Sequence, residues 1–364
     1  MKVPLAAIAL FIAIVCFANM ASPIRYGTKN IAPVTSRNID ITHELLSVTV
    51  DSGFQTATFS IYYYINTDTT GIQVPLMFAA AGSAKDMRIT IDDKLVYLQG
   101  IPSSYTTTSS LPFRGFDGLL SLIGQDRVAV TWDKNSTEYY FLPELQFFEA
   151  DLTKGPHVIH VQYTAQIEIN RSNWVNKYNC NYYLSPARHW KSFGGLDIVL
   201  DKRNFTKPLN TNLGKPVEDA GTITKWYFGS IPADVLQITY NPKAGAFAAA
   251  LIAISPLGLA VIAGIILLAL QVWLMMKYRY HKLIYRLVYY TGTFAVPIIF
   301  YACYFSAFDL IDAVIGDEAA ALHGYTFIFG FSYILVAPAY AGIAYLINDK
   351  IKRKIAAKYS ETFN

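Results

Sequence analysis

The chain of 364 residues is 53% hydrophobic and 15% aromatic but only 15% charged, whereas about a quarter of the residues are charged in an average soluble domain. This balance favours a membrane protein. The net charge of +4 does not indicate a nucleic-acid partner, because residues 22–243 carry 20 Lys and Arg against 20 Asp and Glu. The excess lies mainly in residues 244–364, beside apolar segments, where it reports orientation in a membrane.

The first 21 residues have the features of a secretory signal peptide. Lys2 is followed by an uncharged run over residues 3–21 with an apolar core at 5–17, and a short basic start before such a core is typical of an export signal. Cleavage after Ala18 or Ala21 and retention as an uncleaved signal anchor are both open. Either alternative places the following residues outside the cytoplasm.

Residues 22–243 predict an all-β, sandwich-like extracytoplasmic region of one or two domains. In residues 58–65, Phe59, Ile61, Tyr63 and Ile65 alternate with more polar positions, and a period of two is typical of a half-buried strand. Residues 88–91 and 95–97 form a predicted hairpin around the polar turn at 92–94. Further strands are predicted at 46–50, 127–132, 158–169, 196–200, 223–228 and 236–240.

Cysteine usage limits how the exported region can be stabilised. Cys16 and Cys303 lie in apolar stretches, which leaves Cys180 alone in residues 22–243. One thiol forms no internal disulfide, so this region must rely on its own core, which about 220 residues can supply. An exported domain without disulfides favours a bacterial periplasm over a eukaryotic cell surface.

Three transmembrane spans are predicted within residues 244–348, at about 256–276, 287–308 and 325–347. The first contains 21 uncharged residues, which as a helix span about 30 Å of hydrocarbon. Ser255 and Pro256 form a helix-start pair, a capping hydroxyl followed by a proline at the first helical position. The uncharged run at 244–254 is compatible with a short interfacial or re-entrant helix.

Charge in the connecting segments predicts the orientation of these spans. Residues 277–286 carry four Lys and Arg, the tail at 349–364 is basic, and the loop at 309–318 carries four Asp and Glu without Lys or Arg. By the positive-inside rule, the 277–286 loop and the tail are cytoplasmic. The signal segment independently places residues 22–243 outside, so we expect a multi-pass protein of a bacterial cytoplasmic (inner) membrane.

The stretch 182–195 is densest in aromatic, basic and turn residues, and it supplies the ligand-binding candidates. Tyr182, Tyr183 and Trp190 are suited to stacking on a sugar or base, and Arg188 is suited to pairing with an anion. The alternative, which we favour, is a long connection whose aromatic residues fill the core.

Ionisable residues near the second and third spans supply a second set of candidates, Asp309, Asp312 and His323. Asp309 and Asp312 share a helical face if the second span continues past residue 308. Ionisable groups deep in a bilayer are costly and usually functional, but these three fall near the outer interface. Ordinary interfacial polarity is therefore favoured over a cation or proton site.

No catalytic or metal-binding residue is predicted, and no cofactor is expected. The sequence contains no G-x-S-x-G, P-loop or G-x-G-x-x-G motif, and His157 and His160 fall on opposite faces of a strand. The sequence thus predicts a non-enzymatic membrane protein whose exported domain binds a protein or envelope component. Its helical bundle anchors it in the lipid bilayer or assembles with a protein partner or a second copy.

Two other functions remain open. The first is a subunit of a membrane transport or channel assembly, in which the acidic outer loop attracts cations. The second, which the sequence favours least, is a hydrolase site in the exported domain near Arg188 and His189.

Overall fold

The computed structural model describes residues 24–25, 32–35, 39–73, 76–79, 87–100, 120–123, 127–133, 136–141, 145–321, 323–324 and 326–362. The proposed signal peptide at 1–21 lies outside these residues. The chain divides into two compact units. The β unit comprises residues 24–170 and 177–241, and the helical unit takes in residues 171–176 together with the chain from 242 onwards.

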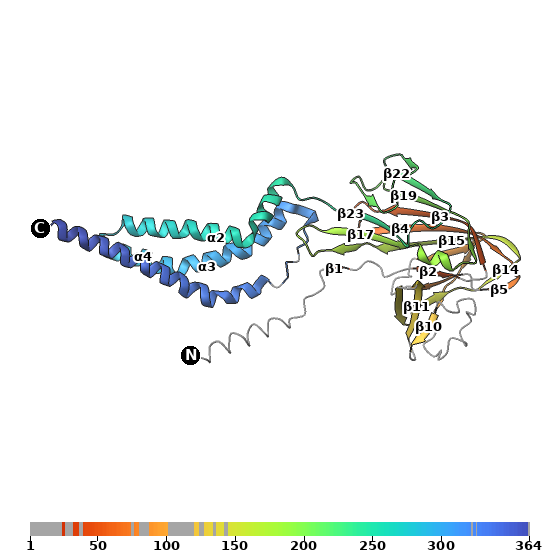
Figure 1. Ribbon diagram of the computed structural model, residues 1–364, viewed down its shortest axis with the longest axis horizontal. Coiled ribbons are helices and arrows are strands. Elements are labelled where there is room, and N and C mark those ends of the chain that lie inside the picture. The colour runs from red at the N-terminus through yellow and green to blue at the C-terminus, as the bar shows by residue number, and fades with distance from the viewer. Residues whose placement is uncertain are drawn as a thin grey trace. The chain divides into compact units, whose positions relative to one another are not determined.

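A nine-stranded mixed sheet forms the largest part of the β unit (Figure 1). Its long central strands pair antiparallel, whereas β19 and the short β18 both run parallel to β3. In sheet order the strands are β21 (Glu218–Asp219), β22 (Ile223–Phe228), β19 (Leu196–Asp201), β3 (Ile39–Val50), β4 (Thr56–Thr67), β15 (Gly155–Gln166), β7 (Arg88–Ile91) and β8 (Lys94–Val96), with β18 (Ser192–Phe193) beside β3.

The second large sheet has five strands, and three smaller sheets complete the unit. The five are β1 (Ile24–Arg25), β16 (Glu168–Asn170), β17 (Lys177–Tyr183), β23 (Val235–Tyr240) and β20 (Asn210–Thr211). The smaller sheets are β2 (Ala32–Thr35), β6 (Leu76–Ala79), β13 (Leu145–Phe147) and β9 (Gln99–Gly100); β10 (Leu120–Ile123), β11 (Arg127–Asp133) and β12 (Ser136–Phe141); and β14 (Ala150–Leu152) with β5 (Gly71–Gln73). None of the described sheets closes on itself.

One apolar core joins the two large sheets. The alternation in β4 buries Phe59, Ile61, Tyr63 and Ile65, because successive strand side chains point to opposite faces. The Phe59 ring stacks on Tyr182 of β17, with ring centroids 5.6 Å apart. The alternating pattern therefore predicted the strand and its buried face correctly.

The predicted hairpin at 88–97 is confirmed, with β7 and β8 joined at Asp92 and Asp93. Both residues have positive φ, 48° and 65°, as a two-residue turn of the I′ type requires. Asp92 also holds His157 of β15: its Oδ2 lies 2.7 Å from Nδ1, and Nε2 lies 2.8 Å from the Thr153 carbonyl. Partial burial lowers the pKa of His157, but the bonds to Asp92 and Thr153 outweigh it and raise the pKa.

Helix α2 (Ala246–Lys277) contains a break at the predicted start pair. Ser255 has φ 68° and ψ 160°, and its Oγ accepts a hydrogen bond from the Gly258 amide at 3.3 Å, so it caps the segment that begins at Pro256. Residues upstream of the break are also helical. The uncharged run at 244–254 is therefore mostly a separate helical segment.

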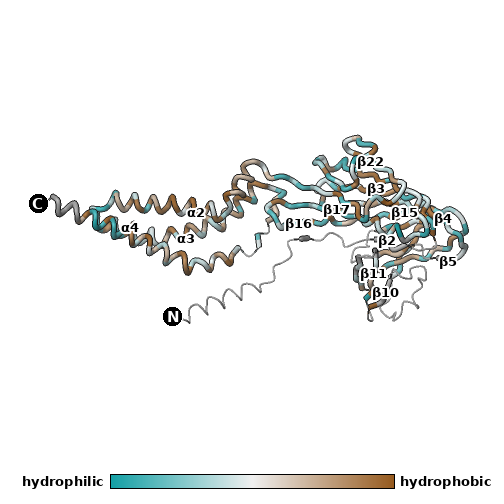
Figure 2. The backbone as a smooth tube through the Cα atoms, viewed as in Figure 1, coloured by the Kyte–Doolittle hydropathy of each residue, from teal (hydrophilic) through white to brown (hydrophobic). Residues whose placement is uncertain are grey.

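Helix α3 (Lys282–Ile315) is followed by two 3-10 segments, η6 (Gly316–Glu318) and η7 (Thr326–Ser332), and by α4 (Tyr333–Thr362). Helix α3 extends beyond the predicted span at both ends, and α4 continues through most of the predicted tail. Lys and Ala have high helix propensity, so the basic segment continues the helix. All three helices are long and apolar enough to cross a membrane (Figure 2).

Polar side chains form hydrogen bonds between these helices. Gln271 of α2 is buried, donates to the Tyr289 carbonyl of α3 at 3.3 Å and accepts from the Tyr340 hydroxyl of α4. Tyr285 of α3 donates to Asn348 of α4 at 2.6 Å. These hydrogen bonds link α2 to α3, α2 to α4 and α3 to α4.

Gly292 of α3 provides a test of this packing. A Cβ at this position would overlap the Gln271 side chain, which is bonded at both ends of its amide. We expect Gly292→Ala to destabilise the helical unit by about 2 kcal/mol, as overpacking does. Gly342→Ala in α4 is the matched control, because its Cβ meets no atom within 4 Å and alanine favours a helix. The measurement is thermal unfolding of the full-length protein in detergent. Equal melting temperatures for the two variants would contradict the expectation.

Candidate functional site

A short excursion of the chain, residues 171–176 between β16 and β17, belongs to the helical unit. The Asn176 amide donates to the Glu318 carbonyl at 2.9 Å, and its side-chain Nδ2 donates to the Ala319 carbonyl at 3.0 Å. The Ala320 amide donates to the Trp174 carbonyl at 3.0 Å. These bonds fix the excursion against the segment that follows α3.

Trp174 forms an aromatic and ionisable cluster with Phe308 and Asp312 of α3 and with His323, which follows that helix. Its ring centroid lies 4.5 Å from His323 and 5.6 Å from Phe308, and the rings of Phe308 and His323 lie 4.9 Å apart. His323 Nε2 lies 2.8 Å from Asp312 Oδ2. We call Trp174, Phe308, Asp312 and His323 the α3-end cluster.

The structure brings together two of the three ionisable candidates. Asp312 and His323 are hydrogen-bonded to each other, whereas Asp309 is exposed and makes no ion pair within the described residues. Asp312 Oδ1 is buried and has no hydrogen-bond partner there. Asp312 Oδ1 is therefore available to a hydrogen-bond donor or to a small cation.

Trp174 was not predicted, and no local signal identifies it. It lies in an irregular segment that is distant in sequence from both Asp312 and His323. The excursion itself has one indication in the sequence, the polar run at 170–173 that interrupts the strand pattern. That run predicts a break between strands, but not the surface that the break packs against.

The four ligand-binding candidates do not lie on one surface. Tyr182 and Trp190 are 3% and 5% exposed and pack in the core of the β unit. Arg188 is exposed and pairs with Asp234 at 2.6 Å, and Tyr183 is half-buried. The side chain of His189 lies outside the described part of the structure. Ligand binding by these residues stays a prediction, and stacking on Trp190 or Tyr182 would require their exposure.

The core of the β unit also contains a buried carboxyl group, which the sequence reasoning missed. Glu44 of β3 is 2% exposed, and its Oε1 accepts a hydrogen bond from the Tyr182 hydroxyl at 3.2 Å. The Tyr63 and Tyr182 hydroxyls lie 3.1 Å apart. Burial raises the pKa of Glu44 to about 7, and the bond from Tyr182 only partly opposes this.

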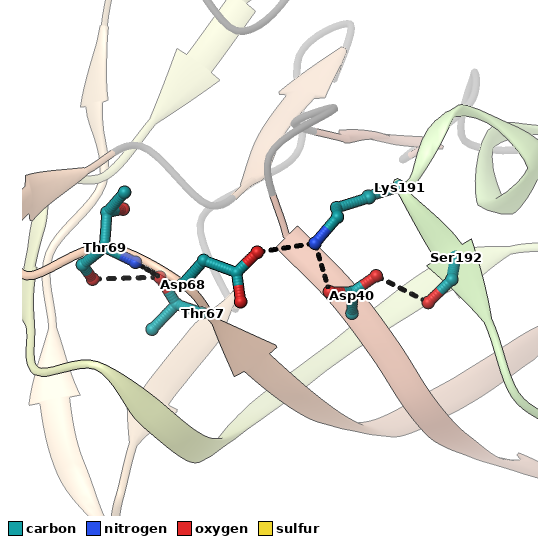
Figure 3. A network of polar contacts seen from close by, with 6 residues as sticks. All are labelled: Asp40, Thr67, Asp68, Thr69, Lys191 and Ser192. Atoms are coloured by element: carbon teal, nitrogen blue, oxygen red, sulfur yellow. Dashed lines mark hydrogen bonds and ion pairs between the residues drawn. The ribbon is translucent and has the colours of Figure 1, made fainter.

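An exposed ionic network ties the segment after Trp190 to the start of β3 (Figure 3). Lys191 Nζ bridges Asp40 at 3.0 Å and Asp68 at 2.5 Å, and the Ser192 hydroxyl donates to Asp40 at 2.6 Å. The bonds from Ser192 and Lys191 hold the pKa of Asp40 below its usual value. Because these charged groups already pair with one another, the network has a structural role.

No group of three or more His, Cys, Asp or Glu side chains is placed to hold a metal ion within the residues that the structure describes.

No protein-family model and no curated protein sequence matches the chain. Among solved structures, a Legionella pneumophila protein provisionally named as nutrient binding is 12% identical, with a TM-score of 0.41, over 59% of this chain and 71% of that chain. Leukotriene A4 hydrolase from Saccharomyces cerevisiae is 11% identical with a TM-score of 0.30, over 65% of this chain.

A zinc metallopeptidase of the M1 class from Deinococcus radiodurans is 9% identical with a TM-score of 0.24, over 58% of this chain. This chain spans about a third of the yeast hydrolase, 34% of its length, and 45% of the metallopeptidase. All three TM-scores lie below 0.5, so these likenesses carry no inference about activity.

Proposed function

We propose that the protein is a non-enzymatic integral membrane protein. Its helices α2, α3 and α4 cross the bilayer and anchor an extracytoplasmic, sandwich-like β unit that binds a protein or envelope component. One observation carries the membrane part of the proposal: the helices expose apolar side chains along their length, while Gln271, Tyr285 and Asn348 are buried and form hydrogen bonds between helices. Such exposed side chains include Ile265, Ile266, Trp273, Leu287, Phe294, Ile298, Ile334, Leu335 and Leu346. This is the pattern that lipid favours.

The excursion at 171–176 supports a role beyond anchoring. The chain leaves the β unit after Asn170, packs in the helical unit, and returns to the β unit at Lys177. A tether needs only one chain connection between the two units, here at residues 241–242. The excursion adds two more such connections, at residues 170–171 and 176–177. Residues 171–176 thus connect the β unit covalently to a segment that is hydrogen-bonded to the residues after α3.

The orientation is tested by cysteine labelling in intact cells. We propose single variants at exposed positions, Lys215→Cys and Asp317→Cys against Arg279→Cys and Lys352→Cys. Native Cys180 is buried, and Cys16 and the partly exposed Cys303 are replaced by serine in the background. A membrane-impermeant maleimide should label the first pair without permeabilisation and the second pair only after it. The reverse pattern would contradict the orientation, and release of the protein by alkaline carbonate would contradict membrane insertion.

The binding role is tested by cross-linking in native membranes, followed by peptide mass spectrometry. Exposed Lys154, Lys177 and Lys215 report on the β unit, and we expect them to cross-link to one recurrent partner at near-equal abundance. Cross-links confined to the helical unit would contradict binding by the β unit.

A transport or channel subunit is the second candidate, and Asp312 Oδ1 is the observation that favours it. If the α3-end cluster holds a proton or cation, Asp312→Asn should abolish cation-dependent flux in proteoliposomes without lowering the amount of folded protein. Asp309→Asn is the matched control, because Asp309 is exposed on the same helix, and it should leave flux unchanged. Absence of wild-type flux, or equal flux in Asp312→Asn, would remove this candidate.

A further inference from the structure

One end of the helical unit gathers basic side chains from two distant parts of the sequence. Tyr285 near the start of α3 donates to Asn348 of α4 at 2.6 Å, and Met275, Tyr285 and Ile351 form a buried cluster. The end of α2, the start of α3 and the later part of α4 therefore meet. The exposed cations there, which we call the basic end, are Lys277, Arg279, Lys282, Arg286, Lys350, Lys352, Arg353 and Lys354.

The basic end has little internal compensation for its charge. Over residues 277–286 and 348–356 the sequence contains a single carboxylate, Asp349. It pairs with Arg353 at 2.9 Å, one helical turn away, and the pair is largely exposed. The other cations make no ion pair within the described residues. Like charges concentrated on one surface attract an anionic ligand.

Aromatic and apolar side chains lie directly beside these cations. Lys277 Nζ lies 5.0 Å from the Trp273 ring centroid, and the Arg279 guanidinium lies 4.7 Å from the Tyr280 ring centroid. Met276, Leu283 and Leu287 are exposed. A ligand that matches this surface combines an anionic group with hydrocarbon, because a soluble polyanion would pair with the cations but would not contact the apolar side chains.

We propose that the basic end binds the phosphate headgroups of acidic phospholipids and selects them over zwitterionic lipids. The proposal rests on the proposed function, because it requires α2, α3 and α4 to lie in a bilayer. The phosphodiester pairs with Lys and Arg side chains while the acyl chains pack on the apolar side chains beside them. This would enrich acidic lipid around the protein at the face where its charge is concentrated.

The test is native mass spectrometry of the full-length protein released from nanodiscs that contain equal amounts of phosphatidylglycerol and phosphatidylcholine. We expect phosphatidylglycerol to be retained preferentially. The variant Lys350→Gln, Lys352→Gln, Arg353→Gln and Lys354→Gln should reduce that preference about tenfold, since each interfacial cation contributes measurably to binding an anionic surface. Raising the salt to 0.5 M should weaken it as well.

The matched control removes four exposed lysines from the β unit, by Lys94→Gln, Lys154→Gln, Lys177→Gln and Lys215→Gln. It lowers the net charge by the same amount as the variant of residues 350–354 but at a different place, and it should keep the preference. Equal retention of both lipids by the wild-type protein, or an equal loss in both variants, would overturn the proposal. Failure to insert into nanodiscs of any composition would overturn the proposed function as well, whereas insertion without preference overturns only the lipid selection.

Discussion

We expect Glu44→Gln to raise the free energy of unfolding of the β unit at pH 8 by about 3 kcal/mol. Burial raises the pKa of Glu44 from 4.5 to about 7 in the folded protein, so the folded state binds its proton more tightly than the unfolded state. Below about pH 4.5 the carboxyl is neutral in both states and carries no penalty. Between pH 4.5 and 7 stability falls as pH rises, and above pH 7 the loss is complete.

The substitution Glu44→Gln removes this charge but keeps the local hydrogen bond, because the amide oxygen of the new side chain accepts from the Tyr182 hydroxyl as Glu44 Oε1 does. The measurement is denaturant unfolding of the full-length protein at pH 5, 6, 7 and 8, with hydrogen exchange of residues 39–67 as the readout of the β unit. Glu149→Gln is the control, since Glu149 is exposed. A gain that did not grow with pH, or a Glu44→Gln protein less stable than wild type at pH 8, would contradict the expectation.

Glu44 also shows where strand patterns fail. Counting back by two from Leu46 puts Glu44 on the apolar face of β3, but a carboxylate at the start of a predicted strand at 46–50 is usually taken as its solvated end. The burial of Glu44 is explained only by its hydrogen bond from the Tyr182 hydroxyl, and Tyr182 lies on a strand far away in sequence. The parallel pairing of β19 with β3 was likewise absent from the prediction, because alternation defines the faces of a strand and not its neighbours.

The helices were predictable because their signals are local. Apolar length predicts a helix, and Ser255 with Pro256 marks a start that the structure places at the break in α2. The site was predictable only in part. Helical spacing suggested that Asp309 and Asp312 act together, but residues three apart differ by about 60° around a helix axis. That difference is sufficient to expose Asp309 while Asp312 faces His323.

We expect Gly194→Ala to destabilise the β unit by about 3 kcal/mol, at the upper end of the usual effect of overpacking. A Cβ on Gly194 would overlap the Thr42 carbonyl oxygen, which is backbone and cannot rotate away as a side chain does. The segment is also fixed on both sides of the glycine. The Gly194 amide donates to the Ile41 carbonyl at 2.9 Å, and the Gly195 carbonyl accepts from the Glu44 amide at 2.9 Å.

Gly229→Ala in the same unit is the matched control, because its Cβ would meet no atom within 4 Å; we expect a change within about 0.5 kcal/mol. Denaturant unfolding at pH 8, monitored by tryptophan fluorescence, measures both variants, and equal stability would contradict the expectation.

The Gly194→Ala variant also tests whether the burial of Glu44 depends on the neighbouring segment 192–195. Separating residues 192–195 from β3 would admit water to the Glu44 amide and carboxyl, so the gain from Glu44→Gln should shrink in the Gly194→Ala background. Groups that share a hydrogen-bonded segment show such non-additivity, whereas two independent sites would give additive changes.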